Sequence, residues 1–508
     1  MENVVVDNEA TPYDEVLYAT HAYRATHPDR LATIARLSGL EPAPVSRCRF
    51  LELGCGSAEN LIAIASGLPD ATFVGCDLAA KAIASGRRFA EAVGLANVTL
   101  LQDDLRAIPE ALGEFDYIVA HGVYSWIPAE VRDGMLALIA RRLAPDGVAF
   151  VSYNAYPGCY VRRMAWEILK FHIEDVPDAA TRLAEARALI TLIADPGTRE
   201  QPRNAAMRAE FRALAERTDA ALFHDDLSST NDPFYFHEFV AHAMDHGLQF
   251  LGEAEFPVMS DLDVAPAVRA VLSGMDRLSR EQYLDFVRCR RFRQTLLCHA
   301  DRAPDRDVVA SRVAPLWAMA RKAVTDEGLV FPSTRAQPAD DPNTTVAPDP
   351  GVIEASRVLD EIRGAWPRPV AVAELASSYR ARSNASNGDG EIPMRLAETL
   401  VAAYASELIE LHTHVPDTPE KAGERPVASA LVRAQLARGQ RITNVWHQDV
   451  ALDDAIAQQL IPLLDGTRDR KALLAALAPS LQGNANVSAP ELLERYLDHC
   501  VELGLLVA

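Results

Sequence analysis

The feature that most constrains this chain is the stretch Phe50–Ser57, which reads FLELGCGS. A short, mostly apolar run leads into two closely spaced glycines, and a helix-forming segment follows from about Ala58. A strand that turns sharply into a helix in this way binds a nucleotide-type ligand at the carboxyl end of a parallel strand. Short glycine-rich turns are common, so the identity of the ligand depends on the strands that follow.

Strands and helices alternate regularly over residues 46–155. Apolar runs end near Gly54, Asp77, Asp104, Gly122 and Asn154, and the segments between them are helix-forming. The helices are expected to end near Ser66 and to span Ala79–Val93 and Glu130–Leu143, with a turn at 145–147 before the last strand. This alternation predicts an α/β fold with a doubly wound, parallel, Rossmann-like sheet.

The rest of the chain divides by composition. Residues 1–45 are expected to form a helical lid, in which Asp29 caps a helix that ends at Gly39. Residues 156–329 read as a mainly helical domain, and residues 330–350, rich in Pro, Thr and Asp, as a linker. Residues 351–508 read as a further, helix-rich domain. Tyr13, Tyr18 and Tyr23 lie at helical spacing in the lid, where packing alone would also explain them.

Composition narrows the possible partners and location. The 508 residues carry a formal net charge of −21, which disfavours binding to DNA or RNA because phosphate contacts rely on Lys and Arg. The seven cysteines are scattered and odd in number, which favours a reducing compartment over disulfides or a zinc site. No long apolar run or secretory signal is visible, so we expect a cytoplasmic protein without membrane insertion.

Charged residues at the strand ends distinguish between ligands. Glu59 stands where a dinucleotide fingerprint has its third glycine, and Glu52 lies inside an otherwise apolar strand. A buried carboxylate is costly unless a cation pairs with it, such as the amine or sulfonium of S-adenosylmethionine. Asp77 can accept the ribose hydroxyls, and Asp104 the adenine amine. Together these acids favour S-adenosylmethionine over a dinucleotide.

At this point the sequence resembles a known family. Residues 46–155 resemble the class I S-adenosylmethionine-dependent methyltransferases. Segments outside this core are similar to the methyltransferases that carry a regulatory domain, whose best-understood members are the rickettsial protein-lysine methyltransferases of outer-membrane protein B. The similarity to their winged-helix-like terminal domain lies in ITNVWHQDV and the residues after it. The resembling segments span nearly the whole chain, among them FDYIVAHGVYSWIP, VSYNAYPG, HDDLSSTNDPFYFHEFVAHAMDHGLQFLGEAEF and RFRQTLLCH.

The resemblance implies a set of cofactor-binding residues. They follow the strands in order, from the methionine-binding turn through the ribose and the adenine to the loop after the fourth strand. These residues are Glu52, Gly54, Cys55, Gly56, Asp77, Leu78, Asp104, Leu105, His121 and Gly122. The loop after strand four lacks the Asn/Asp-Pro-Pro-Tyr/Phe motif, which argues against adenine-N6 and glutamine as acceptors.

Candidate acceptor-site residues lie beyond the same edge of the sheet. Methyl transfer is an in-line displacement, so the protein mainly aligns and desolvates the reactants, and an amine acceptor must lose its proton. For catalysis we expect a carbonyl oxygen, hydroxyls and one near-neutral base: Asn154, Tyr153, Tyr156, Tyr18 and His121. For substrate binding we expect aromatic and polar groups: Tyr13, Tyr124, Trp126, His224 and Asp225. Trp126, Tyr156 and His121 could also serve packing or turn formation.

The histidine-rich segment 224–246 invites a metal interpretation, but its aromatic residues are typical of a buried packing helix, and we expect no metal. The leading hypothesis is a protein-lysine N-methyltransferase acting on exposed lysines of a polypeptide, since about 350 residues lie outside the cofactor domain and the chain is acidic. A small-metabolite N- or O-methyltransferase and a non-catalytic cofactor-binding scaffold stay open as alternatives, and a homodimer is possible.

Overall fold

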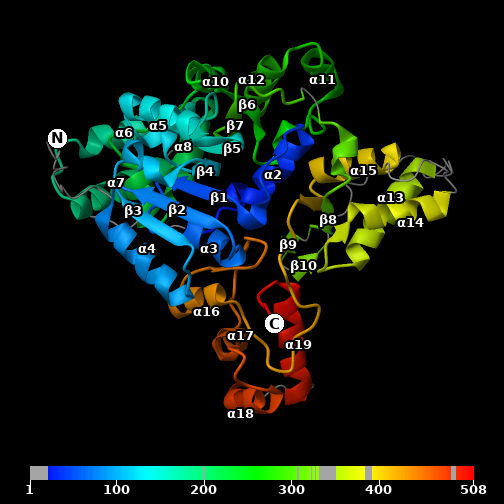
Figure 1. Cartoon of the computed structure of the whole chain (residues 1–508). Helices are drawn as coiled ribbons and strands as arrows, with labels where there is room; N and C mark the ends of the chain where they lie inside the picture. The colour runs from blue at the N-terminus through cyan, green and yellow to red at the C-terminus, as the bar shows by residue number, and fades with distance from the viewer. Residues whose placement is uncertain are drawn as a thin grey trace.

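The computed structural model describes residues 21–197, 201–305, 308–321, 323–325, 328–330, 350–383, 392–481 and 488–508. Its centre is a seven-stranded sheet in the order β3-β2-β1-β4-β5-β7-β6 (Figure 1). Strands β1 to β5 are parallel, and β7 is antiparallel to both β5 and β6. The strands are β1 Arg49–Leu53, β2 Thr72–Asp77, β3 Val98–Gln102, β4 Phe115–Ala120, β5 Leu143–Asn154, β6 Leu248–Glu253 and β7 Phe292–His299. The predicted doubly wound parallel fold is therefore confirmed.

Helices cover both faces of this sheet because each presents one apolar face to it. One core joins the sheet to the first helices of the chain, around Phe50, Leu61 and Phe89. The other lies on the opposite face, around Leu136, Tyr153 and Phe239. The helices are α2 Pro28–Leu37, α3 Glu59–Gly67, α4 Ala80–Val93, α5 Ala129–Arg142 and α10 Phe236–Asp245. These bounds agree with the expected helices to within a residue or two in the core.

The strand β5 is longer than predicted. The expected turn at Pro145-Asp146-Gly147 is wrong, because β5 continues from Leu143 to Asn154 and meets β4 through an irregularity in register. That irregularity lies where Phe115 pairs with Leu143 and Tyr117 pairs with Val148. The three turn-forming residues are thus accommodated as a local bulge at the amino end of a single strand.

The region after the core adds two strands that the sequence did not predict. The segment RFRQTLLCH, expected to be helical, forms β7 beside β5. Its alternation was hidden by Arg293, a charged residue that lies fully buried and pairs with Glu253, Glu281 and Asp285. A buried strand residue of this kind gives no apolar signal, so hydrophobic periodicity misses the strand.

Other helices of this region do match the expectation of a helical domain. A three-helix cluster packs Leu169, Ile190 and Phe211 together at the side of the sheet, next to a short π-helical turn. The elements are α6 Tyr160–Ile173, α7 Ala179–Ala194, α8 Pro202–Ala215, α9 Asp219–Ala221, η6 Leu222–Asp226, η7 Phe256–Met259, α11 Pro266–Leu272 and α12 Arg277–Arg288.

The predicted boundary at 330–350 is wrong as a division between domains. Strand β8, before it, pairs with β11 and β12, which lie after it. Residues on both sides share one core, which includes Leu316, Leu375 and Leu400. The elements are η8 Ala310–Val313, β8 Trp317–Ala320, β9 Ala323–Thr325, β10 Gly328–Val330, α13 Pro350–Gly364, β11 Val370–Ala371, α14 Val372–Ser383, α15 Met394–Ala405 and β12 Ile409–His412. Residues 331–349 lie outside the described part.

The last part of the chain forms a separate core beneath the sheet in Figure 1, around Leu460, Leu477 and Leu497. The predicted C-terminal domain thus divides: residues 350–412 share a core with β8 and η8, and the residues after 412 form a unit of their own. This last unit contains α16 Ala430–Ala437, β13 Ile442–Thr443, β14 Asp449–Val450, α17 Ala455–Leu460, η9 Ile461–Leu463, α18 Arg470–Leu481 and α19 Ala489–Glu502. We call it the winged-helix unit, and α16 packs against α3 and α4.

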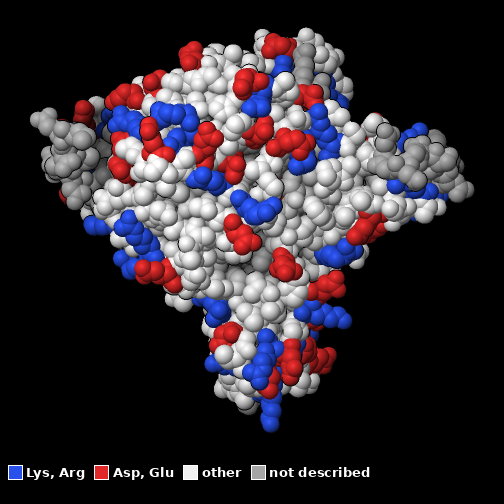
Figure 2. All heavy atoms as spheres, viewed as in Figure 1, with Lys and Arg blue, Asp and Glu red and all other residues white. Residues whose placement is uncertain are grey.

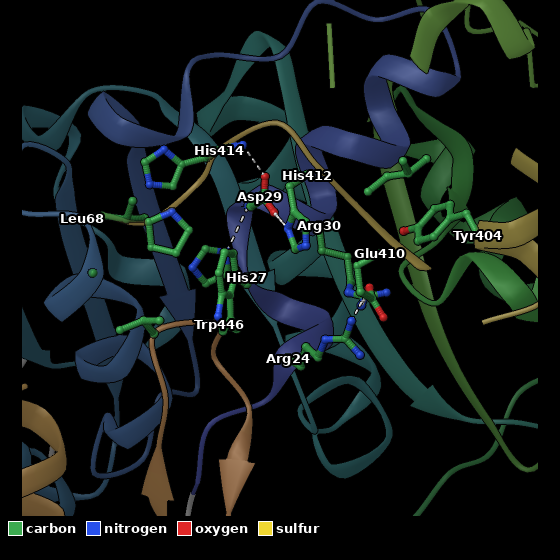
Figure 3. A pocket seen from close by; sticks show the side chains of 14 residues that line it. Arg24, His27, Asp29, Arg30, Leu68, Tyr404, Glu410, His412, His414 and Trp446 are labelled. Carbon is green, nitrogen blue, oxygen red and sulfur yellow. Dashed lines mark hydrogen bonds and ion pairs between the residues drawn. The ribbon is translucent and has the colours of Figure 1, made fainter. Parts of the chain in front are cut away.

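The segment before the sheet is helical as expected, but Asp29 does not cap its helix. His27 is the N-cap of α2 and accepts from the Asp29 amide, while η1 Arg24–Thr26 and η2 Val45–Arg47 flank the helix. The Asp29 carboxylate instead accepts from Thr413, His414 and His412, which holds its pKa at about 2 (Figure 3). Residues 1–20 lie outside the described part.

Charges of both signs are mixed on the face shown in Figure 2, where no single sign dominates. Among the described residues, no helix is both long and apolar enough to span a bilayer.

Candidate functional site

A cavity of about 720 Å³ lies at the carboxyl edge of the sheet. Residues at the end of each of the five parallel strands line it: Gly54, Asp77, Asp104, His121 and Asn154. The order of strands reverses between β1 and β4, and such a switch point is where doubly wound sheets bind their ligands. The cavity thus lies where the sequence predicted the site.

The glycine turn brings backbone close to the cavity. Gly54 has a φ of 69°, and a Cβ there would lie 2.5 Å from Val123 Cγ2, so the turn has no room for a side chain. The amides of Gly54 and Cys55 donate to the Cys76 carbonyl at 2.8 and 3.1 Å, which ties the turn to the end of β2. A flat backbone surface is therefore exposed to any ligand that enters.

Glu52, near the carboxyl end of β1, is a buried carboxylate in the wall of the cavity. Its side chain is 4% exposed, and Oε1 accepts from Asn60 Nδ2 at 2.8 Å. Oε2 is buried without a hydrogen-bond partner among the described residues. Burial raises the Glu52 pKa to about 8, and the negative charges of Glu59 and Asp77 add to the effect. A cationic group in the cavity would satisfy the orphaned oxygen and restore the charged form.

Asp77 and Leu78 form the next part of the wall. The Asp77 carboxylate accepts from the Gly56 amide and from the Ala79 amide, both at 2.8 Å, so two backbone donors fix its orientation. Leu78 is 53% exposed although it is a large apolar residue, and it lines the cavity. A carboxylate held beside an exposed apolar surface suits a ribose joined to a flat base.

Asp104 also lines the cavity, but it has a partner already. Arg106 binds its carboxylate with a backbone amide and two guanidinium nitrogens at 2.6 to 2.9 Å, which lowers the Asp104 pKa. Leu105 and Asp103 lie beside it on the same wall. The predicted adenine contact by Asp104 stays a prediction, and Asp103 is a second carboxylate within the same turn.

His121 and Gly122 follow β4 at the middle of the cavity. Ser152 Oγ accepts from the Gly122 amide at 2.8 Å and lies 3.1 Å from His121 Nδ1. The His121 ring packs against Tyr23 from the lid, with ring centroids 4.0 Å apart. Burial lowers the His121 pKa to about 4, so the imidazole is neutral at pH 7. The expected near-neutral base at this position is therefore wrong, and His121 shapes the cavity as a weak base.

The far end of the cavity is built around Asn154. Its backbone N–H donates to Ser125 Oγ at 2.9 Å, and its side-chain Nδ2 donates to Asn231 Oδ1 at 3.0 Å. The carbonyl oxygen of the Asn154 side chain is thus turned away from Asn231, on the other side of the same amide group. Asn231 Nδ2 in turn contacts the Asp225 carbonyl at 3.3 Å. These bonds connect the end of β5 to the segment that contains η6 and Asn231.

The π-helical turn η6 supplies His224 and Asp225 to the cavity wall. Arg217 pairs with the Asp225 carboxylate, and Arg162 pairs with Asp226 at 2.8 Å. Burial raises the pKa of both aspartates, and the arginines oppose this shift. A π-turn is a costly local geometry that often occurs at functional sites, and here it turns two titratable side chains toward one cavity.

Not all of the predicted acceptor residues reach this cavity. Trp126, His224 and Asp225 line it, and their substrate-binding roles stay predictions. Tyr153 is 1% exposed and stacks on Phe239, so its catalytic assignment is wrong. Tyr124 is buried as well, with its hydroxyl 2.7 Å from His242 Nδ1, so its substrate-binding assignment is wrong.

Three further tyrosines of the prediction lie elsewhere. Tyr156 is half-buried and stacks on Tyr160 with centroids 4.3 Å apart, outside the lining of the cavity. Its ring packs against Tyr160 and Tyr235, and its catalytic role stays a prediction. Tyr13 and Tyr18 lie outside the described residues, and their roles stay predictions.

The structure adds lining residues to which the sequence assigned no ligand contact; of these, the sequence singled out Tyr23 alone, as a packing residue. They come from the lid, from α3, from α6 and from the start of β7: His21, Tyr23, Asn60, Cys159, Arg162, Arg291 and Phe292. Asn60 follows the second glycine by four residues, a spacing that places it in the first turn of α3 beside Glu52. The others come together only through the tertiary fold.

Asp133, His242 and His246 form the cluster that resembles a metal site, with candidate ligand atoms within 4.8 Å of one another. His246 Nε2 lies 2.9 Å from the Asp133 carboxylate, which lowers the Asp133 pKa. Hydrogen bonds within the cluster account for its geometry. That no metal takes part stays a prediction.

Three family profiles match separate parts of the chain. They are described as "Methyltransferase domain" over residues 50–147, "Predicted methyltransferase regulatory domain" over 218–299, and "PKMT, C-terminal winged helix domain" over 424–491. The first contains the glycine turn, Asp77, Asp104 and His121. The second begins just before η6 and ends with β7.

Two relatives from Rickettsia prowazekii are similar to this chain over part of its length. The chain is 37% identical over 299 residues to the uncharacterized protein RP789 of Rickettsia prowazekii (strain Madrid E), which covers 58% of this chain and 54% of RP789. It is 34% identical over 232 residues to the uncharacterized protein RP028 of the same organism. This match covers 46% of this chain and 93% of RP028. The chain thus spans about half of RP789 and most of RP028.

Among solved structures, PKMT2 from Rickettsia typhi matches with a TM-score of 0.78 and 23% identity, over 97% of this chain and 100% of that one. The structure of PKMT2 in complex with AdoHcy matches with a TM-score of 0.77 and 24% identity, over the same shares. At these identities the match establishes a common fold over almost the whole chain.

Proposed function

Because the chain belongs to the class I S-adenosylmethionine-dependent methyltransferases that carry a regulatory domain, we propose that it methylates lysine side chains of a protein substrate. One observation carries the proposal: a single cavity joins a cofactor end, with Glu52 and Asp77, to a second end with Asn154 and Asp225. Support for lysine also comes from relatives whose names contain PKMT, the abbreviation for protein-lysine methyltransferase.

The residues at the cofactor end fit S-adenosylmethionine. The orphaned Glu52 Oε2 suits the cationic amino-acid end, and the glycine turn lines the cavity beside it. Asp77 is oriented for the ribose, and the exposed Leu78 offers an apolar surface to the base. When bound, this cofactor supplies a methyl group on a sulfonium. The cavity exceeds what such a ligand fills, which leaves space for an acceptor side chain.

The acceptor end has the groups that an amine needs. A lysine amine with a pKa of about 10.4 is protonated at pH 7 and must lose a proton to react. The Asn154 carbonyl oxygen can accept a hydrogen bond from the amine and aim its lone pair. Asp225 can take the proton, because burial raises the pKa of that carboxyl above its usual range. Asn231 links these two residues and fixes their relative position.

The lid and the other walls exclude water from the reacting groups. Tyr23 covers His121, and Trp126 and Phe292 add aromatic surface to the cavity. Aromatic faces attract both an ammonium and a sulfonium, so they stabilise cations without donating a hydrogen bond to them. A lysine side chain is long and narrow, so it can reach between these aromatic side chains into the cavity while the rest of the substrate protein stays outside.

A second candidate is a small acceptor that carries a carboxylate. Arg162 and Arg291 both line the cavity, and a free carboxylate pairs well with guanidinium groups. Each arginine already has an acidic partner, Asp226 for Arg162 and Glu210 for Arg291. We therefore rank this candidate below the protein substrate.

The test uses the full chain with methyl-labelled S-adenosylmethionine and two acceptor pools, a lysine-bearing protein extract and its small-molecule filtrate. We expect label in protein, located on lysine by mass spectrometry, and loss of that label with Glu52→Ala. Label confined to the filtrate would refute the protein substrate and favour the second candidate. No label in either pool, together with tight cofactor binding, would indicate a binding protein without turnover.

A further inference from the structure

The winged-helix unit reaches the cofactor site through its β13–β14 hairpin. His447, in the loop between β13 Ile442–Thr443 and β14 Asp449–Val450, is 3% exposed although it belongs to a tight turn. Its Nε2 lies 3.0 Å from Asn60 Oδ1, across 387 positions of sequence. Asn60 lies in the first turn of α3, directly behind the glycine turn.

Asn60 is fully engaged on both sides of its amide. Its Oδ1 accepts from the Tyr23 amide at 2.8 Å, from Thr26 Oγ1 at 3.1 Å and from His447 Nε2. Its Nδ2 donates to Glu52 Oε1 at 2.8 Å. The Tyr23 amide can only donate and the charged Glu52 carboxylate can only accept, so these two partners fix the orientation of the Asn60 amide; the Thr26 hydroxyl divides its one proton between Asn60 and the Tyr23 carbonyl. The lid and the winged-helix unit thus hold the Asn60 side chain so that its NH₂ group, and not its oxygen, faces Glu52.

Glu52 is the point where this chain of hydrogen bonds meets the cavity. Oε1 is held by Asn60, while Oε2 is buried and lacks a hydrogen-bond partner among the described residues. A carboxylate held by one oxygen has its second oxygen aimed in a defined direction. Glu52 lines the cavity, so Oε2 is the oxygen left to pair with a cation bound there.

The hairpin that carries His447 is rigidly built. Asn444 Oδ1 accepts from the Trp446 and Gln448 amides at 3.0 and 2.9 Å, and the Val445 amide donates to the Gly504 carbonyl at 3.0 Å. His447 itself has a φ of 55°, a left-handed conformation that costs a non-glycine residue free energy. An unfavourable backbone conformation that the surrounding bonds maintain is a reason to look for a role of that residue.

The surroundings of His447 keep it neutral. The His27 ring lies 5.3 Å away, the Arg24 cation is nearby, and burial is the main cause that lowers the His447 pKa well below 6.5. Figure 3 shows His27 and Trp446 together at this junction, beside Asp29 and His412. A neutral imidazole that faces a carbonyl oxygen must carry its proton on Nε2, so His447 is the donor.

We propose that His447 of the winged-helix unit is a positioning residue of the cofactor site: it holds the Asn60 amide, which aims Glu52 at the cationic amino-acid end of the cofactor. The proposal rests on the function proposed above, since it concerns the same cofactor. It gives the winged-helix unit a direct part in cofactor binding. Coupling of this kind is reciprocal, so cofactor binding in turn stabilises the docked hairpin.

A packing role alone would have different consequences. Other contacts of the winged-helix unit with the core avoid Asn60: Arg438 lies over the Phe89 ring at 4.5 Å and contacts Ser85, and Gln440 contacts Glu59. If His447 only helped the unit to dock, then loss of Arg438 would have a comparable effect on ligand binding. Arg438→Ala is therefore the matched control.

The experiment measures binding of two ligands to the full chain by calorimetry. S-adenosylhomocysteine carries the amino-acid end, whereas 5′-methylthioadenosine keeps only the nucleoside and its sulfur. The variants are His447→Phe, which keeps a ring but loses the N–H donor, and His447→Asn, which suits the left-handed backbone but is too short to reach Asn60. His447→Gln, which can replace the donor, is the rescue variant.

We expect both His447→Phe and His447→Asn to weaken S-adenosylhomocysteine binding by about tenfold and to leave 5′-methylthioadenosine within about twofold. His447→Gln should recover most of the loss, and Arg438→Ala should behave as the parent. In an Asn60→Ala background, His447→Phe should have no further effect. Should His447→Phe fail to fold, His447→Asn decides the question.

Unchanged preference for S-adenosylhomocysteine in His447→Asn would overturn the proposal. An equal loss for both ligands, or an equal loss in Arg438→Ala, would also overturn it, because either result indicates docking alone. If the parent binds neither ligand, the proposed function fails instead, so the two failures are distinguishable.

Discussion

The two ends of the cavity are built in different ways. The cofactor end is made by short segments at the ends of consecutive strands. The Gly56 and Ala79 amides hold Asp77 there, whereas Glu52 is held by the Asn60 side chain. The acceptor end is made by side chains from β5, η6 and β7, which ion pairs hold in place, such as Arg162 with Asp226. The glycine turn and Asp77 are thus built from residues at the ends of neighbouring strands, and only the support of Glu52 comes from distant regions. The acceptor end as a whole depends on how separate regions pack.

This difference teaches where each kind of specificity resides. A site made of backbone turns binds one ligand and tolerates little change. A site made of side chains on several elements can be altered by substitution at many positions without loss of the fold. We therefore expect substitutions at the first end to affect cofactor affinity and those at the second to affect turnover.

The largest effect is expected for Gly54→Ala. A Cβ at Gly54 would lie 2.5 Å from Val123 Cγ2, and the φ of 69° adds strain, so the turn must move. We expect affinity for S-adenosylhomocysteine to fall by more than about a hundredfold in calorimetry.

The control for this substitution is Gly94→Ala. Gly94 has a φ of 84° at the end of α4, and nothing lies within 4 Å of its Cβ position. It should lose stability, by about 1 kcal/mol, and bind the ligand as the parent does. Parent-like binding by Gly54→Ala would show that this turn does not hold the cofactor.

At the acceptor end, Asn154→Ala should lower kcat by roughly tenfold to a hundredfold while the dissociation constant of S-adenosylhomocysteine is unchanged. The reason is that Asn154 aligns the acceptor and does not touch the glycine turn. Asn97→Ala, which removes an amide bonded to main-chain carbonyls before β3, is the control and should keep parent-like turnover. Weaker cofactor binding in Asn154→Ala would contradict the proposal that the acceptor end affects turnover and not cofactor affinity.

Asp77→Ala should weaken S-adenosylhomocysteine binding by at least ~1.5 kcal/mol, or about tenfold, because the hydrogen bonds to a charged acceptor are lost. Asp116→Ala removes a carboxylate that also accepts from a backbone amide, that of Arg49, but at the opposite edge of the sheet. It should bind as the parent does. Equal affinities for Asp77→Ala and the parent would show that Asp77 does not bind the ligand.

The smallest effect concerns pH and the ligand-free chain. The Glu52 pKa is raised to about 8 from an ordinary value of 4.5, so the folded state binds this proton more tightly than the unfolded state. Stability from Glu52 is thus present below pH 4.5 and is lost as the pH rises through 8. Because Glu52 lines a cavity that is open to solvent, hydration of its charged form makes the effect smaller than the full pKa shift would give.

Glu52→Gln removes that titration. Between pH 5 and pH 9 the ligand-free parent should lose stability that the variant keeps. The unfolding free energy of the variant minus that of the parent should therefore rise by on the order of 1 kcal/mol over this range. Denaturant unfolding at both pH values measures it. A difference that does not change with pH would mean that Glu52 is already charged and paired in the free protein.

The same contrast explains how much the sequence could predict. Glu52, the two glycines and Asp77 follow strands with a clear apolar signal, so their places in the fold and cavity follow from the alternation of elements. Asn154 was found for the same reason, because it ends β5. His224 and Asp225 were proposed from family resemblance, and the fold brings them to the cavity through η6.

Other predictions failed for physical reasons that the sequence does not reveal. Tyr153 precedes Asn154, and adjacent strand residues point to opposite faces, so only one of the two can face the cavity. Strand β7 was missed because Arg293 is buried by ion pairs and not by apolar contacts. The boundary near residue 330 was misplaced because β8 pairs with strands that lie far along the chain.

The most direct test of the account is a crystal structure of the chain with S-adenosylhomocysteine. We predict that the ligand lies at the carboxyl edge of β1 and β2, with its amino group within hydrogen-bond distance of Glu52 Oε2 and its ribose on Asp77. Density for the ligand elsewhere, or a Glu52 carboxylate that makes no contact with it, would contradict the account.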